Sequence, residues 1–426
     1  MAGIATTGWK TWLRHHYRWR IAALLLFATT INYLDRSVLS ILAPFLQHEF
    51  GWTEIDYGFI VAAFQLAYGT GVLFTGRLLD KYGNRLVFAI AMAVWSVAGM
   101  GHALARGVMG FAVARFMLGL GESANFPASI KTVAEWFPQK QRALITGIFN
   151  AGSTIGAIIA PLLVPLIAVQ WGWRWAFIIT GFIGLVWMQC WLKTYRLPAQ
   201  HKKVTAEELA YINADSDPPA PKTSLAGLLL RRETLVIAFA RFLTDPVWWF
   251  LLYWLPKFLE KRFHISLMDI GLPLVTIYVA ADLGGIAGGW LSSSLIKKGR
   301  RVDGARKTAM LACAVCALPL IFIAQGPGLW PCVLCISLAA AAHQGWASNI
   351  FTVVSDIFPK TEVATVVGIS TVAAVLGGIL ASAAIGWALD KTNSYSLVFS
   401  VAGCMYLLAW LAMKLGIPVI KDQRSQ

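Results

Sequence analysis

Twelve stretches of apolar residues, each long enough for a membrane-crossing helix, make up most of this chain. A helix needs about 20 mostly apolar residues to cross the hydrocarbon core of a bilayer. The stretches do not alternate between apolar and polar residues, which excludes transmembrane β-strands. We therefore predict an all-α membrane protein with twelve transmembrane helices. The expected spans are residues 19–43, 57–79, 86–105, 109–130, 143–168, 173–192, 234–256, 269–296, 308–325, 329–352, 363–389 and 395–415.

The composition supports the same class. Of the 426 residues, 58% are hydrophobic and only 13% are charged, whereas soluble domains carry about 25% charged residues. So little polar surface excludes a soluble protein, and so much apolar material excludes a disordered one. The first span runs past the length of a signal-peptide core and contains Asp35 and Arg36. We therefore expect it to remain as a helix rather than to be cleaved as a secretory signal.

The positions of the basic residues predict the orientation. With the N-terminus placed inside, 27 of the 36 Lys and Arg fall in inside segments and six in outside loops. The remaining three, Arg36, Arg115 and Arg241, fall within spans. Cytoplasmic loops carry such an excess of Lys and Arg, so we expect both termini in the cytoplasm. The net charge of +15 then reflects topology and indicates no nucleic-acid partner.

A single long polar stretch divides the spans into two sets of six. We expect an N-terminal six-helix bundle over residues 1–193, a cytoplasmic central loop over 194–233 and a C-terminal six-helix bundle over 234–426.

The two halves also resemble each other in sequence. A shift of 213 residues places Phe45 on Phe258 and Gly58 on Gly271, and a shift of 221 places Pro138 on Pro359. The constant offsets predict two six-helix repeats of the same orientation. Parallel repeats of this kind are typical of transporters that rock around a central site.

Four charged residues within the spans of the first half require a reason, because a charge at mid-bilayer costs at least about 2.5–3.5 kcal/mol. They are Asp35 and Arg36 in the first span, and Arg115 and Glu122 on one face of the fourth. Arginine binds carboxylates bidentately and keeps its charge, and a carboxylate in a cavity can bind a proton. The group indicates a proton-coupled anion carrier. The alternative is two internal salt bridges that join the first and fourth spans.

At the corresponding positions the second half carries aromatic and neutral polar residues. Rings that stack on a sugar face, next to amides that bind its hydroxyls, suit a polyhydroxylated ligand. The two adjacent tryptophans have an alternative role as anchors at the membrane interface, and Asp245, followed by Pro246, could cap a broken helix. The candidate ligand contacts are Trp248, Trp249, His343, Gln344, Trp346 and Asn349.

The loop between the second and third spans combines Gly76, Asp80 and Arg85. A carboxylate beside basic groups at helix ends can latch a rocking domain, so we expect these residues to take part in gating. The alternative is a tight glycine turn with solvated charges.

Two paired cysteines match the spacing of a zinc site, but we reject this interpretation. Cys313, Cys316, Cys332 and Cys335 lie within apolar spans, where the thiolates that bind a metal are disfavoured. The chain has no phosphate-binding glycine loop, so ATP is not expected to power it. No nucleophile, base and orienting group can be placed together, so we expect no enzyme activity, no metal and no cofactor other than coupling protons.

Several motifs resemble those of one transporter family. Residues 76–85 resemble the signature loop of the major facilitator superfamily, and residues 32–36 and 115–127 resemble its anion:cation symporter family. Residues 242–250 and 342–349 look like the bacterial hexuronate transporters. The resemblance covers nearly the whole chain and implies the major facilitator fold.

The resemblance also implies roles for individual residues. Asp35 and Glu122 would be the protonatable coupling carboxylates, and Arg36 and Arg115 would bind the substrate carboxylate and complete the charge network. Ser153 stands where galactonate-type relatives have Gln, which favours a hexuronate. The remaining candidates in the N-terminal half are Tyr33 and Tyr68 as cavity residues, with Asn150, Ser153 and Thr154 as contacts for substrate hydroxyls.

We therefore expect a multi-pass symporter of the bacterial inner membrane. It would import glucuronate or galacturonate with protons by alternating access, as a monomer in the lipid bilayer. The alternatives are a proton- or sodium-coupled carrier of another organic anion, such as an aldonate, an aldarate or tartrate, and a membrane sensor with a transporter-like fold.

Overall fold

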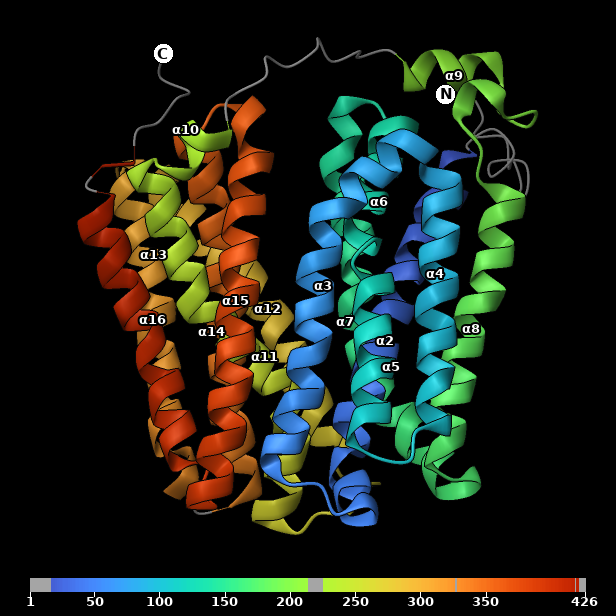
Figure 1. The fold of residues 1–426 in the computed structure, drawn as a ribbon. Coiled ribbons are helices and arrows are strands. Elements are labelled where there is room, and N and C mark those ends of the chain that lie inside the picture. The colour runs from blue at the N-terminus through green and yellow to red at the C-terminus, as the bar shows by residue number, and fades with distance from the viewer. Residues whose placement is uncertain (1–16, 214–224, 326–327, 418, 421–426) are drawn as a thin grey trace, which may run out of the picture.

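The computed structural model describes residues 17–213, 225–325, 328–417 and 419–420. These residues form helices and connections, without strands. Two bundles stand side by side, one from each half of the chain (Figure 1). The all-α class expected from the apolar stretches is confirmed.

The N-terminal bundle contains seven long helical segments. They are α2 (Arg18–Phe50), α3 (Glu54–Tyr82), α4 (Asn84–Gly101), α5 (Val108–Glu122), α6 (Asn125–Trp136), α7 (Gln139–Trp171) and α8 (Trp173–Thr194). The C-terminal bundle contains α11 (Arg232–Phe263), α12 (Gly271–Lys297), α13 (Val302–Ala317), the 3-10 helix η3 (Leu318–Gln325), α14 (Leu329–Ile357), α15 (Lys360–Thr392) and α16 (Ser396–Gly416).

Ten helices in the described part of the chain are long and apolar enough to cross a membrane. The other two expected spans also coincide with helical segments, but of a different kind. The expected span 109–130 is divided into α5 and α6 at Ser123 and Ala124. The expected span 329–352 lies in α14, which carries His343, Gln344 and Asn349 in its second half.

Helix bounds follow the two sequence offsets. Both ends of α7 and α15 differ by 221 residues, as do the start of α5 and the end of α6 from those of α14. Packing repeats as well, because α2 packs on α7 as α11 packs on α15, and α3 packs on α5 as α12 packs on α14. The bundles are therefore two copies of one arrangement in the same orientation.

Small residues allow these helices to approach closely. A Cβ at Gly152 or Gly156 of α7 would meet the backbone carbonyls of Leu26 or Thr30 in α2. In the other half, Gly284 of α12 lies against the backbone of α14. Membrane helices associate without a hydrophobic driving force, so close backbone packing of this kind carries much of their stability.

The segment 194–233 was expected to be one polar loop, but it contains the short helices η2 (Pro198–Gln200), α9 (Ala206–Ile212) and α10 (Leu225–Leu229). The Glu208 carboxylate of α9 accepts hydrogen bonds from the backbone N–H groups of Tyr17 and Arg18, at 2.9 and 3.1 Å. A carboxylate favours a helix N-terminus, so this contact fixes the segment to the start of α2. Burial lowers the pKa of His201, whose ring packs on Tyr17.

The two halves join at the end opposite α9 (Figure 1). Lys257 Nζ lies 2.6 Å from Glu54 Oε2, and the Tyr57 hydroxyl donates to the Tyr253 carbonyl at 2.6 Å. Lys257 was expected in an outside loop, but it is buried within α11. Since Gly58 also lies against the Ser382 carbonyl, this end is closed by direct contact between the halves.

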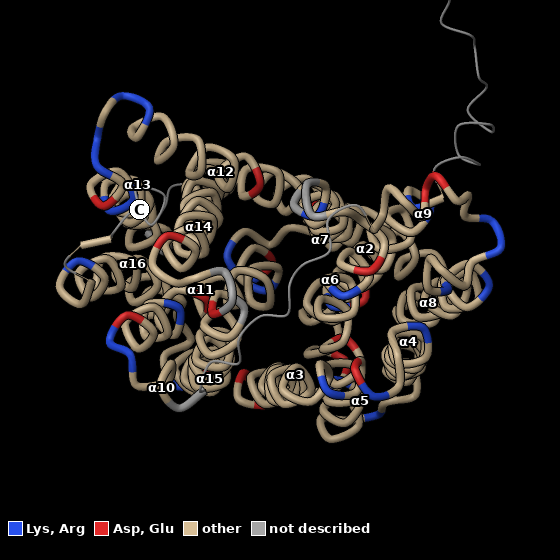
Figure 2. The backbone as a smooth tube through the Cα atoms, turned by 90° about the horizontal axis from the view of Figure 1, so that it is seen from above, with Lys and Arg blue, Asp and Glu red and all other residues tan. Residues whose placement is uncertain are grey.

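The opposite end carries the basic connections. Seen from the side of α9 and α10, Lys and Arg lie mainly on the connections around the rim, including the one between α12 and α13 (Figure 2). Toward this end the two bundles diverge (Figure 1). The cytoplasmic placement of this end stays a prediction from the basic residues.

Close packing of α7 on α2 predicts that Gly156→Val lowers the melting temperature of the detergent-purified protein. The added side chain meets the Thr30 carbonyl, and such overpacking costs about 1–3 kcal/mol. The control is Gly147→Val on the same helix, where no atom lies within 4 Å of the added Cβ. Equal melting temperatures for the two variants would contradict this account of the α2–α7 contact.

Candidate substrate-binding and coupling site

Arg36 lies at the centre of the N-terminal bundle, buried and fixed by α5. Its Nη2 and Nε donate to Glu122 Oε2 at 2.8 and 3.0 Å, and its Nη2 also reaches Asn32 Oδ1 at 3.4 Å. Its guanidinium also faces the rings of Tyr33 and Tyr68, at 4.9 and 5.2 Å from their centroids. Arginine favours aromatic faces as well as carboxylates. The ion pair therefore uses one oxygen of Glu122 and leaves Oε1 without a partner.

Arg115 and Asp35 complete the charge cluster, and both keep unused polar atoms. Arg115 Nη2 donates to the backbone carbonyl of Arg36 at 3.0 Å, but its Nε and Nη1 have no partner. Neither carboxylate oxygen of Asp35 accepts a hydrogen bond, although only 4% of the residue is exposed. Buried polar groups are usually satisfied. The cluster thus holds two cations and two carboxylates with capacity left for a further ligand or for protons.

The two halves enclose a cavity of about 40 Å³ beside this cluster. Tyr33 connects the two, because Arg36 lies over its ring while Tyr33 also lines the cavity. Five of the expected site residues meet here, from three helices besides α2. The lining residues are Tyr33, Ser153, Thr154, Ala157, Trp248, Leu252, Tyr278, Asp282 and Gln344.

Other expected contacts lie elsewhere in the described structure. The Asn349 amide donates to the carbonyls of Gly288 and Gly345, at 3.0 and 2.9 Å, and so joins α14 to α12. Trp346 is fully buried against Tyr406.

Trp249 and Asn150 also lie outside the cavity lining. The Trp249 ring packs against Gly378 of α15, and Asn150 is exposed on α7. The roles of these four expected residues in ligand binding stay predictions.

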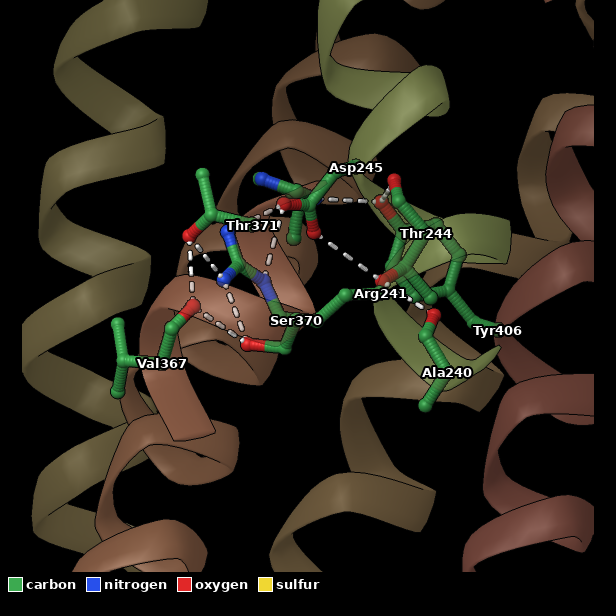
Figure 3. Close-up of polar contacts among 9 residues, drawn as sticks. Ala240, Arg241, Thr244, Asp245, Val367, Ser370, Thr371 and Tyr406 are labelled. Carbon is green, nitrogen blue, oxygen red and sulfur yellow. Dashed lines mark hydrogen bonds and ion pairs between the residues drawn. The ribbon is translucent and has the colours of Figure 1, made fainter. Parts of the chain in front are cut away.

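His343 connects the cavity to a second polar network. Its ring stacks on that of Trp248 with centroids 5.2 Å apart, and its Nδ1 lies 2.7 Å from the Tyr406 hydroxyl. The Tyr406 hydroxyl in turn reaches the Thr244 carbonyl at 3.5 Å (Figure 3). This places an imidazole behind a cavity-lining tryptophan.

The expectation that in-span ion pairs are confined to the first half is wrong. Arg241 Nη2 lies 2.8 Å from Asp245 Oδ2, one helical turn further along α11, and Arg241 Nη1 donates to Ser370 and Thr371 (Figure 3). The alternative that Asp245 caps a broken helix is also wrong, because α11 continues through Pro246. A residue four positions from an arginine on a helix faces it, and this spacing was the overlooked signal.

Asp282 is the other residue that sequence reasoning missed. It is the single acid in the middle of the apolar stretch 269–296, and it lines the cavity between the halves. An ionisable residue inside a span indicates a functional site by default, and that signal was present in the sequence.

The expected gating residues lie at the α9 end of the N-terminal bundle. Asp80 forms an ion pair with Lys131 at 2.6 Å, and Arg85 Nη2 donates to the Leu192 carbonyl at 2.6 Å. Both line a cavity of about 400 Å³ together with Tyr195. Gly76 has open space at its Cβ position. Their part in gating stays a prediction.

Comparison with known proteins identifies the family. A family profile described as Major Facilitator Superfamily matches residues 25–302. The chain belongs to this superfamily. It is 33% identical over 402 residues to the hexuronate transporter of Escherichia coli K12, with 93% of each chain covered. It is 29% identical over 383 residues to the D-galactonate transporter of Escherichia coli O6:H1, covering 87% of this chain and 89% of the relative.

More distant comparisons agree. The probable galactarate/D-glucarate transporter of Bacillus subtilis is 29% identical over 442 residues, covering 99% of this chain and 95% of the relative. A bacterial homolog of the human lysosomal transporter Spinster, solved inward-facing and unoccupied, aligns with a TM-score of 0.71, 17% identity and coverage of 94% and 98%. The inward-open xylose transporter of Escherichia coli aligns with a TM-score of 0.72, 18% identity and coverage of 94% and 97%.

The protein is therefore a multi-pass membrane transporter and not an enzyme. The names of its relatives support an organic-anion transporter within the superfamily. Among the described residues, no group of three or more His, Cys, Asp or Glu side chains is placed to hold a metal ion.

The buried ion pair predicts that Glu122→Leu destabilises the protein by about 3–5 kcal/mol, because it leaves Arg36 charged and without its partner. The double variant Arg36→Met with Glu122→Leu should recover much of this loss, since no uncompensated cation remains. Thermal unfolding in detergent measures both. In the half-exposed Arg231–Glu362 pair, Glu362→Leu should change stability by less than about 1 kcal/mol. A double variant no more stable than the single one would disprove the coupling.

Proposed function

We propose that the protein imports a hexuronate, glucuronate or galacturonate, together with protons by alternating access. The observation that carries the proposal is the buried cluster of Arg36, Arg115, Glu122 and Asp35 beside a cavity lined from both halves. It combines groups that bind an anion with groups that exchange protons, and it lies where the two halves meet. The protein is proposed to work as a monomer without a cofactor, with protons as the coupling ion.

The binding chemistry follows from the unused donors. Arg115 has two free N–H positions, and Arg36 is held by a single oxygen of Glu122. A sugar carboxylate that displaces this oxygen gains charge-assisted hydrogen bonds from a guanidinium. The rings of Tyr33 and Trp248 offer apolar faces to the sugar ring, while Ser153, Thr154 and Gln344 bind hydroxyls.

Two observations favour a hexuronate within the organic anions. Ser153 occupies the position at which galactonate-type relatives are expected to have Gln, and it lines the cavity. The hexuronate transporter of Escherichia coli K12 is 33% identical over nearly the whole chain. Competition of labelled glucuronate by a panel of hexuronates, aldonates, aldarates and tartrate separates this proposal from the other organic anions.

Proton coupling follows from competition for Arg36. In the described state Glu122 occupies this guanidinium. A proton on Glu122 removes its charge and frees Arg36 for the substrate carboxylate. Asp35 is buried without a partner, and a bound proton removes the desolvation cost of its charge. Proton binding on the outside therefore favours substrate binding, and proton loss on the inside restores the Arg36–Glu122 pair and expels the substrate.

The energetics require such coupling. An inside-negative potential opposes uptake of an anion by about 2.3 kcal/mol per charge per 100 mV. One proton per monoanion removes this opposition, and the pH gradient adds a driving force.

The described state fits one step of this cycle. Its halves are joined at the end opposite α9 through Lys257 and Glu54, which the basic-residue bias places outside. The central cavity of about 40 Å³ has room for about one water molecule. Substrate binding therefore requires the halves to separate around the cavity.

Uptake by proteoliposomes tests the proposed function. Labelled glucuronate or galacturonate should accumulate when the external pH is lowered without sodium, because inward proton movement drives the anion. A sodium gradient at equal pH on both sides should have no effect. Accumulation that follows sodium and ignores pH would overturn the proposed coupling.

Glu122→Gln should abolish pH-driven accumulation but retain counterflow exchange, because the amide cannot carry a proton cycle yet leaves Arg36 available to substrate. Glu207→Gln, on the exposed face of α9, is the matched control and should accumulate normally. Normal pH-driven accumulation by Glu122→Gln would remove this carboxylate from the coupling mechanism.

A further inference from the structure

Asp282 is a membrane-embedded acid that the transport cycle described above does not use. It lies 11 residues after the start of α12 at Gly271 and 15 before its end at Lys297, near the middle of the helix. Such a residue is expensive within a membrane and faces protein or water rather than lipid. Its position on the cavity between the two halves satisfies this requirement.

The surroundings of Asp282 leave its carboxylate free for a ligand. No hydrogen bond or ion pair joins it to another residue in the described part of the chain. The cavity lining contains no Lys or Arg, and its other polar members are hydroxyls, the indole of Trp248 and the amide of Gln344. Its charge therefore faces the ligand space without a compensating cation.

The site consequently has two electrostatic poles. The positive pole is Arg36 with Arg115, and it lies behind Tyr33, whose ring centroid is 4.9 Å from the Arg36 guanidinium carbon. The negative pole is Asp282, on the helix of the opposite half. A ligand with a carboxylate at one end and hydroxyls at the other satisfies both poles, because hydroxyls donate hydrogen bonds to a carboxylate.

A ligand with carboxylates at both ends meets a conflict. When one carboxylate binds the positive pole, the second lies toward Asp282, and like charges in a partly desolvated site repel strongly. Discrimination against a wrong ligand often uses such a repulsive element. The relatives show that both ligand classes occur in the superfamily, since hexuronates and D-galactonate carry one carboxylate, whereas galactarate and D-glucarate carry two.

We propose that Asp282 is a specificity-determining residue that admits sugar acids with one carboxylate and rejects those with two. The inference rests on the proposed function, because it needs a sugar acid held by Arg36 and Arg115. It adds the basis on which this transporter distinguishes hexuronates from aldarates.

The test uses galacturonate and galactarate, which differ only at the carbon that is an aldehyde in one and a carboxylate in the other. Each competes with labelled galacturonate in counterflow by proteoliposomes that contain wild type, Asp282→Asn or Asp282→Glu. For wild type, galactarate should need at least about tenfold higher concentration than galacturonate. Asp282→Asn should bring the two to within about threefold, and Asp282→Glu should keep the preference of wild type.

Two controls isolate the charge at this position. Asp390→Asn makes the same change of net charge at an exposed residue of α15 and should keep the preference. Ser153→Ala removes a neutral polar group from the same cavity and should weaken both acids alike. Asn and Glu differ little from Asp in size, and size-exclusion chromatography confirms folding of each variant.

The outcomes separate the two claims. If wild type transports galacturonate and galactarate equally well, or if Asp282→Asn keeps the full preference, the assignment of Asp282 is wrong while the proposed function stands. If wild type exchanges neither acid, the proposed function is wrong and the role of Asp282 falls with it.

Discussion

The cost of placing charge inside a membrane governs this structure. Two cations and two carboxylates lie buried in the N-terminal half, and a single ion pair, Arg36–Glu122, satisfies part of their polar capacity. An arrangement that served stability alone would satisfy every donor and acceptor. Free donors on Arg115 and free oxygens on Asp35 instead indicate groups held ready for a ligand and for protons. The two repeats and the closed end position this cluster beside the cavity between the halves.

The second half solves the same problem differently. Its buried cation, Arg241, is saturated by Asp245, Ser370 and Thr371, so it stabilises the contact between α11 and α15. The acid that remains unpaired there is Asp282, which faces the cavity. The central site is therefore asymmetric, with a positive pole from one repeat and a negative pole from the other, although both repeats share one helix arrangement.

Much of the fold could be predicted from the sequence, because uninterrupted apolar runs have few physical solutions in a membrane. The break between α5 and α6 at Ser123 and the continuity of α11 through Pro246 could not, since neighbouring helices can support or interrupt a helix regardless of local propensity. For the site, charge within a span was a reliable signal for Arg36 and Glu122. Asn349 shows its limit, because a polar side chain in a span can equally serve to join two helices.

The most direct test of the central claim, that one site couples sugar acid to protons, is luminal pH in sealed proteoliposomes with no imposed gradient and no sodium. External glucuronate or galacturonate should acidify the lumen, because each anion carries protons inward. Entry of labelled acid without any change in luminal pH would contradict the account.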